Sequence, residues 1–137
     1  MITRTCQLRR SISVVPEMHD LLRAYYDEHS VDEGTAFALD LAAEEVFTNM
    51  VRHNTSDRDS LSMTIEISAD AVHLQWVDHD VPPFDPKNQP AVDITRPIED
   101  RQPGGLGLHL TQSLVDQLDY SYEDGNLRVD VVKRFGA

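Results

Sequence analysis

The stretch LDLAAEEVFTNMVRH, residues 39–53, has the spacing of an amphipathic helix. At about 100° per residue, one side of this helix carries the apolar side chains of Leu39, Ala42, Ala43, Val46, Phe47 and Met50. Glu45, Asn49 and His53 recur at every fourth residue, so they stack along one border of the apolar stripe. A carboxylate and an amide at such a half-buried border can face a pocket. Taken alone, the stretch is better explained by a surface helix with solvated polar side chains, which is the commoner case.

A glycine-rich turn, Gly104-Gly105-Leu106-Gly107, opens a second helical pattern far downstream. Glycines leave backbone N–H groups uncovered, and the N-terminus of a helix carries partial positive charge, so the turn is a candidate anion site. It is not a P-loop, because no Gly-Lys-Ser/Thr follows it. Many helices begin after glycines, so this signal is also weak by itself.

The length and composition indicate one globular domain. With 137 residues, the chain is long enough for one hydrophobic core and too short for two, so we expect a single domain over residues 1–137. No apolar run approaches the roughly 18 residues of a membrane span, and no signal peptide opens the chain. Cys6 is the only cysteine, which excludes an internal disulfide and indicates a reducing, cytoplasmic location.

The charge balance is strongly acidic, with a formal net charge of −12 and a sequence pI near 4.7. An acidic surface repels a phosphate backbone, which argues against nucleic-acid binding. The same field opposes the binding of a free nucleotide. A nucleotide site in this chain therefore needs a metal ion and locally directed backbone N–H groups.

Hydrophobic periodicity predicts a strand, two helices, a hairpin, a long loop, a third helix and a second hairpin. The first strand is expected at 5–15 and the first helix at 16–28, and the second helix is capped by Ser30 or Asp32 and ends near residue 53. The first hairpin is expected at 61–67 and 72–76 and the long loop at 78–102. The third helix is expected at 105–118 and the second hairpin at 120–123 and 127–135. Strands paired as hairpins, with helices inserted between them, predict an α/β (α+β) two-layer sandwich. We expect a mixed sheet in which most neighbouring strands are antiparallel, with the helices on one face.

Glu45 and Asn49 make chemical sense as a pair, because they lie one helical turn apart. The amide oxygen of Asn49 is a hard ligand suited to Mg²⁺, which usually completes its shell with waters and substrate phosphates. The carboxylate of Glu45 can orient or deprotonate a hydroxyl that attacks a γ-phosphate.

A third candidate segment, Asp78-His79-Asp80-Val81-Pro82-Pro83-Phe84-Asp85-Pro86, follows the strand expected at 72–76. An aspartate at this strand end can accept a hydrogen bond from an exocyclic amine such as that of adenine. A loop of ordinary turn formers explains the same residues, and for the segment alone it is the simpler interpretation.

Taken together and in this order, the three segments resemble the Bergerat-fold ATPases of the GHKL superfamily, which includes histidine kinases and gyrase-type ATPases. Within it, AAEEVFTNMVRH, PPFDP and GGLGLHLTQSLVDQLDY are similar to the small stand-alone branch, the anti-sigma-factor serine/threonine kinases. The resemblance covers residues 37–135, and the combination is far more specific than any single motif. It implies a Bergerat ATP-binding fold with ATP and Mg²⁺ as its ligands.

Carried over residue by residue, the resemblance implies Glu45 as the general base and Asn49 as the Mg²⁺ ligand. It places at the triphosphate the three glycines Gly104, Gly105 and Gly107. Residues 85–102 correspond to the mobile lid of this family, from which Arg101 or Arg96 can reach the phosphates.

The middle segment departs from the family pattern, which usually has Asp-x-Gly a few residues before the Phe-Asp pair. Counting back from Phe84 puts His79 in the place of the aspartate, whereas counting forward from the strand puts Asp78 there. Strand parity favours Asp78, because it shares a face with Trp76 that we expect the helices to cover. Neither alignment supplies the glycine, whose small size permits close approach of the backbone to a base.

The resemblance therefore implies an ATP-dependent serine/threonine protein kinase that also acts as an anti-sigma factor. The implied partners are a STAS-type anti-sigma-factor antagonist, which the kinase phosphorylates, and a sigma factor, which it binds when the antagonist is modified. No direct contact with nucleic acid or a membrane is implied, and the branch often forms homodimers. The missing glycine motivates one alternative, a partner-switching binding module of the same fold with weak or no ATP binding.

Overall fold

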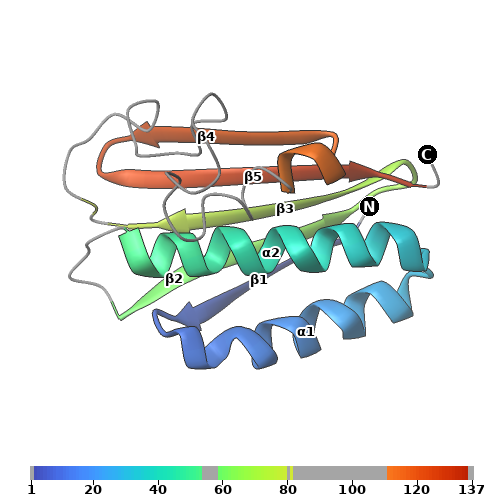
Figure 1. Ribbon diagram of the computed structural model, residues 1–137, viewed down its shortest axis with the longest axis horizontal. Coiled ribbons are helices and arrows are strands. Elements are labelled where there is room, and N and C mark those ends of the chain that lie inside the picture. Colours follow the sequence, from blue (N-terminus) through green and yellow to red (C-terminus); the bar gives the residue numbers. More distant parts are fainter. Residues whose placement is uncertain (1, 54–58, 80, 82–110, 136–137) are drawn as a thin grey trace, which may run out of the picture.

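The computed structural model describes residues 2–53, 59–79, 81 and 111–135 (Figure 1). Its elements, in chain order, are β1 (Ile2–Arg9), η1 (Ile12–Val14), α1 (Val15–Glu28), α2 (Glu33–His53), β2 (Ser60–Ile67), β3 (Ala71–Asp78), β4 (Gln117–Glu123) and β5 (Asn126–Arg134). A helical turn at residues 111–114 precedes β4. Among these described helices, none is both long and apolar enough to cross a lipid bilayer.

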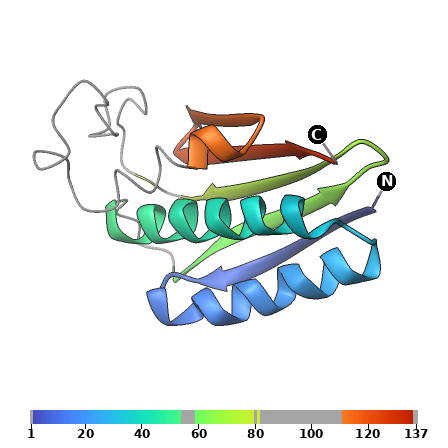
Figure 2. The same ribbon diagram turned by 45° about the vertical axis from the view of Figure 1, so that its right-hand side comes forward.

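The five described strands form one sheet in the order β1-β2-β3-β5-β4, and each neighbouring pair is antiparallel. Helices α1 and α2 lie against the same face of this sheet, with α1 toward its β1 edge (Figures 1 and 2). The predicted two-layer sandwich with helices on one face is therefore confirmed. Within the described strands, the sheet is antiparallel throughout.

Alternation along β2 and β3 builds the hydrophobic layer between the sheet and the helices. Every second residue of each strand is buried, and the register places Trp76 between Met63 on β2 and Val129 on β5. Helix α2 adds the apolar stripe that its sequence predicted, each side chain at most 1% exposed: Leu39, Ala42, Ala43, Val46, Phe47 and Met50. This stripe fixes which side of α2 faces the sheet, and hence which sides remain for polar residues.

The first strand is shorter than predicted, because β1 ends at Arg9 and not near residue 15. Ser11 caps η1, since its side chain accepts a hydrogen bond from the backbone N–H of Ser13. Such a local bond offers the backbone an alternative to the sheet ladder. Ile12 is consequently 39% exposed while Val14 is buried, so the apolar alternation in this stretch does not continue the strand.

The third helix was predicted to reach residue 118, and this was wrong. The described helical turn ends at Leu114, and the N–H of Asp116 donates to the carbonyl of Val132 at 2.9 Å. Leu118 therefore lies on β4, opposite Val131 of β5. The leucine spacing fits a helix, but pairing with a distant strand overrides that local preference.

Helix α2 begins where Asp32 caps it. Oδ2 of Asp32 accepts a hydrogen bond from the backbone N–H of Thr35 at 3.0 Å, and Oδ1 accepts one from the Thr35 hydroxyl at 2.8 Å. Ser30 instead has a positive φ of 56° and belongs to the turn between α1 and α2. Of the two predicted caps, the structure therefore selects Asp32.

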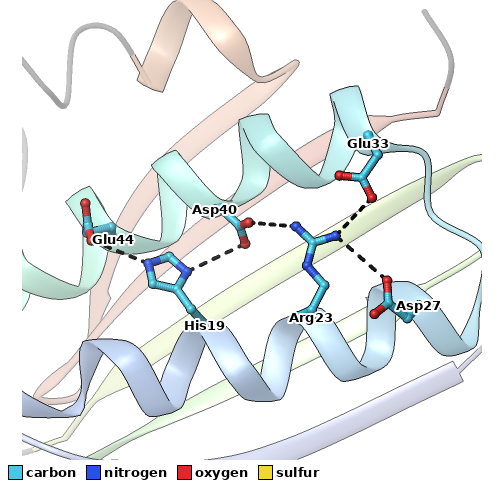
Figure 3. Close-up of polar contacts among 6 residues, drawn as sticks. All are labelled: His19, Arg23, Asp27, Glu33, Asp40 and Glu44. Atoms are coloured by element: carbon cyan, nitrogen blue, oxygen red, sulfur yellow. Dashed lines mark hydrogen bonds and ion pairs between the residues drawn. The ribbon is translucent and has the colours of Figure 1, made fainter.

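An ionic network joins α1 to one flank of α2 (Figure 3). Arg23 on α1 pairs with Asp40 at 3.2 Å and with Glu33 at 3.3 Å. His19 lies between Asp40 and Glu44, at 3.6 and 3.4 Å. Partly exposed pairs of this kind stabilise by only about 0.2–1 kcal/mol each. The main consequence of the network is orientation, because it directs Glu44 toward α1.

Candidate active site

Glu45 and Asn49 lie on the flank of α2 that faces away from α1. Glu44 reaches His19 on α1 (Figure 3), and a rotation of about 100° per residue carries the next side chain around the helix, away from α1. Asn49 follows Glu45 one turn later and shares its flank. Both side chains are half-buried, so the predicted position of this pair at the border of the apolar stripe is confirmed.

The flank that carries Glu45 is also the flank near the helical turn at residues 111–114. Both views place this turn on the side of α2 opposite α1 (Figures 1 and 2). A surface hollow at the start of α2 has Ala38, Leu114 and Lys133 in its lining. Ala38 precedes Glu45 by two helical turns on the same flank. The polar pair on α2 and the end of the third helix therefore border one side of the sandwich.

The electrostatic environment of Glu45 raises its pKa. Burial raises the pKa above the ordinary value of a glutamate, the charge of Glu44 raises it further, and Arg52 lowers it. A carboxylate whose pKa is shifted toward neutrality is a more effective proton acceptor than an ordinary one. This environment suits a general base.

Asp78 is the last residue of β3, and its side chain lies on the helix-covered face of the sheet. It is fully buried, as are Leu74 and Trp76 on the same face, so the parity argument is confirmed. Its carboxylate forms an ion pair with the guanidinium of Arg10, which is itself only 10% exposed.

His79, the alternative to Asp78, is directed toward the β4–β5 hairpin. Its Nδ1 lies 2.9 Å from Oδ1 of Asn126, which is the first residue of β5. Val81, two residues after His79, also contacts the hairpin, because its carbonyl accepts a hydrogen bond from the hydroxyl of Tyr122 at 2.6 Å. These contacts attach His79 and Val81 to the hairpin, so of the two candidates Asp78 is the residue that faces the helices.

The remaining predicted site residues lie outside the described residues. They are Gly104, Gly105, Gly107, Arg101 and Arg96, together with the lid at 85–102. Their roles stay predictions.

Two arginines that interact with predicted site residues, Arg10 and Arg52, were not predicted from the sequence. Arg10 pairs with Asp78 across 68 positions of sequence, and no local spacing signals a contact of that range. Arg52 lowers the pKa of Glu45 and follows it by two helical turns, so helix geometry could have identified it.

The described side chains fit a magnesium nucleotide. Asn49 and Glu45 offer oxygen donors at half-buried positions, and Mg²⁺ is typically bound through one or two protein oxygens, waters and substrate phosphates. Asp78 offers a buried acceptor at a strand end. All three residues sit on regular elements, α2 and β3, which hold such groups more precisely than loops do.

The two-layer sandwich is the fold that the resemblance to nucleotide-binding GHKL domains implied, and Glu45, Asn49 and Asp78 lie on its regular elements α2 and β3. Residues 10–133 match the family model described as the histidine kinase-like ATPase domain. The chain belongs to this family, and the predicted relationship to GHKL ATPases is confirmed.

A curated relative is the serine/threonine-protein kinase BtrW of Bordetella bronchiseptica, which is 30% identical over 91 residues. That match covers 65% of this chain and 63% of the relative. The solved RsbU and RsbW domains of Rv1364c from Mycobacterium tuberculosis match with a TM-score of 0.72 and 14% identity, over 98% of this chain and 33% of that one. The histidine kinase AdeS of Acinetobacter baumannii matches with a TM-score of 0.55 and 12% identity, over 100% of this chain and 70% of that one. The two structural matches agree with the observed fold.

Proposed function

We propose that this protein is a serine/threonine kinase of the anti-sigma-factor type, which uses Mg-ATP to phosphorylate a small antagonist protein. The observation that carries the proposal is Glu45, a half-buried carboxylate with a raised pKa, one turn before Asn49 on the same flank of α2. Membership of a family of ATPase domains supports ATP as the phosphoryl donor. The relative named as a serine/threonine-protein kinase supports a hydroxyl as the acceptor.

In the proposed mechanism, Glu45 accepts the proton of a serine or threonine hydroxyl of the antagonist while the hydroxyl oxygen bonds to the γ-phosphorus of ATP. The bond between that phosphorus and the β–γ bridging oxygen breaks, and ADP leaves with the oxygen. Asn49 is the proposed ligand of Mg²⁺, which when bound neutralises part of the phosphate charge. Asp78 accepts a hydrogen bond from the exocyclic amine of adenine, and Gly105 and Gly107 offer backbone N–H groups to the phosphates.

The proposed partners are a STAS-type antagonist as the phosphate acceptor and a sigma factor as the alternative binding partner, with a homodimer as the assembly. They follow from the similarity of the three motifs to the anti-sigma-factor kinases. The acidic surface, with a net charge of −12, disfavours direct contact with nucleic acid.

A second candidate function is a partner-switching module of the same fold that binds ATP weakly or not at all. The observation that favours it is the sequence around the end of β3, where neither Asp80 nor Val81 is the glycine that the family usually has. A side chain at that position opposes close approach of the backbone to a base.

Calorimetric titration of the purified protein with ATP and Mg²⁺ separates the two candidates. A dissociation constant in the micromolar range supports the kinase, whereas no heat up to millimolar nucleotide supports the module. The titration is repeated without the divalent metal. Because a net charge of −12 repels a free polyanion, binding should depend strongly on Mg²⁺, and moderate salt should weaken it little.

Substitution Arg52→Gln is expected to move the acid limb of the pH–rate profile of phosphoryl transfer to higher pH. Arg52 lowers the pKa of Glu45, so its removal raises that pKa, and the base is then deprotonated only at higher pH. The measurement is the transfer rate as a function of pH for the parent and the variant. Arg4→Gln on the exposed part of β1 makes the same charge change as a control. Superimposed acid limbs for Arg52→Gln and the parent would contradict an influence of Arg52 on the group that titrates during transfer.

A further inference from the structure

A buried ion pair closes one end of the sheet. Arg10 directly follows β1 and Asp78 ends β3, while β2 lies between these two strands. Since neighbouring strands are about 4.8 Å apart, the Arg10 side chain has to reach across the start of β2 to meet the carboxylate. The backbone of Arg10 is held there, because its N–H donates to the carbonyl of Asp59 at 2.8 Å.

Both charged side chains are removed from water, with exposed fractions of 10% for Arg10 and 0% for Asp78. A buried carboxylate without a compensating cation is strongly disfavoured, so the guanidinium allows Asp78 to carry its charge in this position. A buried ion pair is nevertheless a poor source of stability, because desolvation offsets most of the attraction. Stability alone is therefore an incomplete account of why a charged pair occupies this place.

The charge state of Asp78 decides which chemical groups it can bind. An ionised carboxylate only accepts hydrogen bonds, whereas a neutral carboxyl also donates one. A 6-amino purine presents a donor at position 6, and a 6-oxo purine presents an acceptor there. If Asp78 faces position 6 of the purine, its ionised carboxylate attracts a 6-amino purine and repels a 6-oxo purine. A neutral side chain at residue 78 tolerates both purines.

We propose that Arg10 is a positioning residue that makes the site at the end of β3 selective for 6-amino over 6-oxo purine nucleotides. It acts through Asp78, whose charge it compensates and whose carboxylate it orients. This inference rests on the proposed function in one respect, namely that a nucleotide binds with position 6 of its base at Asp78.

The test compares the binding of Mg-ATP and Mg-ITP to the full chain by calorimetry. ITP carries the 6-oxo group, so its acceptor oxygen would face the acceptor oxygen of Asp78. We therefore expect ITP to bind the parent at least about tenfold more weakly than ATP does. Arg10→Gln keeps a hydrogen-bond donor near Asp78 but removes the charge. We expect this variant to lose most of the ATP/ITP preference. Arg10→Lys, which retains the charge, should keep most of it.

A purely structural role of Arg10 predicts a different pattern. Loss of packing lowers the affinities for ATP and ITP together and leaves their ratio unchanged, and equal ratios in the parent and Arg10→Gln would overturn the inference. Arg23→Gln is the matched control, because it removes an arginine from another ion-paired cluster, the network between α1 and α2. It should leave the ATP/ITP ratio unchanged.

A second comparison uses the Asp78→Asn background and keeps the inference testable if the single variant Arg10→Gln folds poorly. The side-chain amide introduced by Asp78→Asn is neutral with or without Arg10, so adding Arg10→Gln there should not alter the ATP/ITP ratio. A change in the ATP/ITP ratio in that background as large as in the parent background means that Arg10 acts without the charge of Asp78, which contradicts the inference. Failure of the parent to bind Mg-ATP at all contradicts the proposed function, whereas equally tight binding of ATP and ITP contradicts this inference and the adenine contact of Asp78 but leaves the kinase proposal intact.

Discussion

Substitution Glu45→Gln is expected to slow phosphoryl transfer by about 10²–10⁴-fold, the usual contribution of a general base, while Mg-ATP binding changes little. Glutamine has nearly the same shape as glutamate but cannot take up the hydroxyl proton. The substitution keeps the half-buried position of the side chain and removes the titratable group whose pKa is raised. The measurement is single-turnover transfer from ATP to a STAS-type antagonist, with nucleotide affinity measured separately by calorimetry.

The matched control for this prediction is Glu44→Gln, one position away on α2. Glu44 faces α1, where it lies 3.4 Å from His19, so it should take no part in transfer. Its charge raises the pKa of Glu45, and its removal should therefore shift the acid limb of the rate profile to lower pH. At neutral pH we expect a change of no more than about twofold. Parental rates in Glu45→Gln, or an equal loss in Glu44→Gln, would rule out the assigned role of Glu45.

Much of the helix-and-strand pattern could be predicted, because it rests on short-range periodicity. The spacing of Val46, Phe47 and Met50 identified the buried side of α2, and each is buried in the structure. The same spacing put Glu45 and Asn49 at the border of that stripe. Period-two alternation identified β2 and β3, and with them the burial of Asp78 at a strand end.

Features that depend on long-range contacts could not be predicted from spacing. Leu118 fits a helical pattern but lies in the sheet, because β4 pairs with β5 along its whole length. Arg10 fits an alternating strand, yet Ser11 ends that strand locally and the Arg10 side chain reaches Asp78. The partners of Leu118 and of the Arg10 side chain are remote in sequence, so no window of a few residues contains these contacts.

The two flanks of α2 have separate tasks, which explains why one helix carries so much of the proposed site. On one flank, Asp40 and Glu44 hold α1 through Arg23 and His19 (Figure 3). The buried apolar stripe of α2 sets the rotation of the helix about its axis, and the contact with α1 is consistent with that setting. On the other flank, Glu45 therefore has a fixed direction relative to the sheet, which its proposed role as a general base requires.

The largest effect on stability is expected for Phe47→Ala, because Phe47 lies on the buried side of α2. Phe47 is 0% exposed within the core, and truncation of a buried phenylalanine costs about 3–5 kcal/mol through lost transfer energy and the cavity left behind. The matched control is Phe37→Ala, on α2 but 61% exposed, where we expect a change of no more than about 0.5 kcal/mol. Urea unfolding followed by the fluorescence of Trp76 measures both, because this tryptophan is the only one in the chain and is fully buried. Equal unfolding midpoints for the two variants would show that α2 does not pack through Phe47, and the orientation of Glu45 and Asn49 derived from that packing would then be wrong.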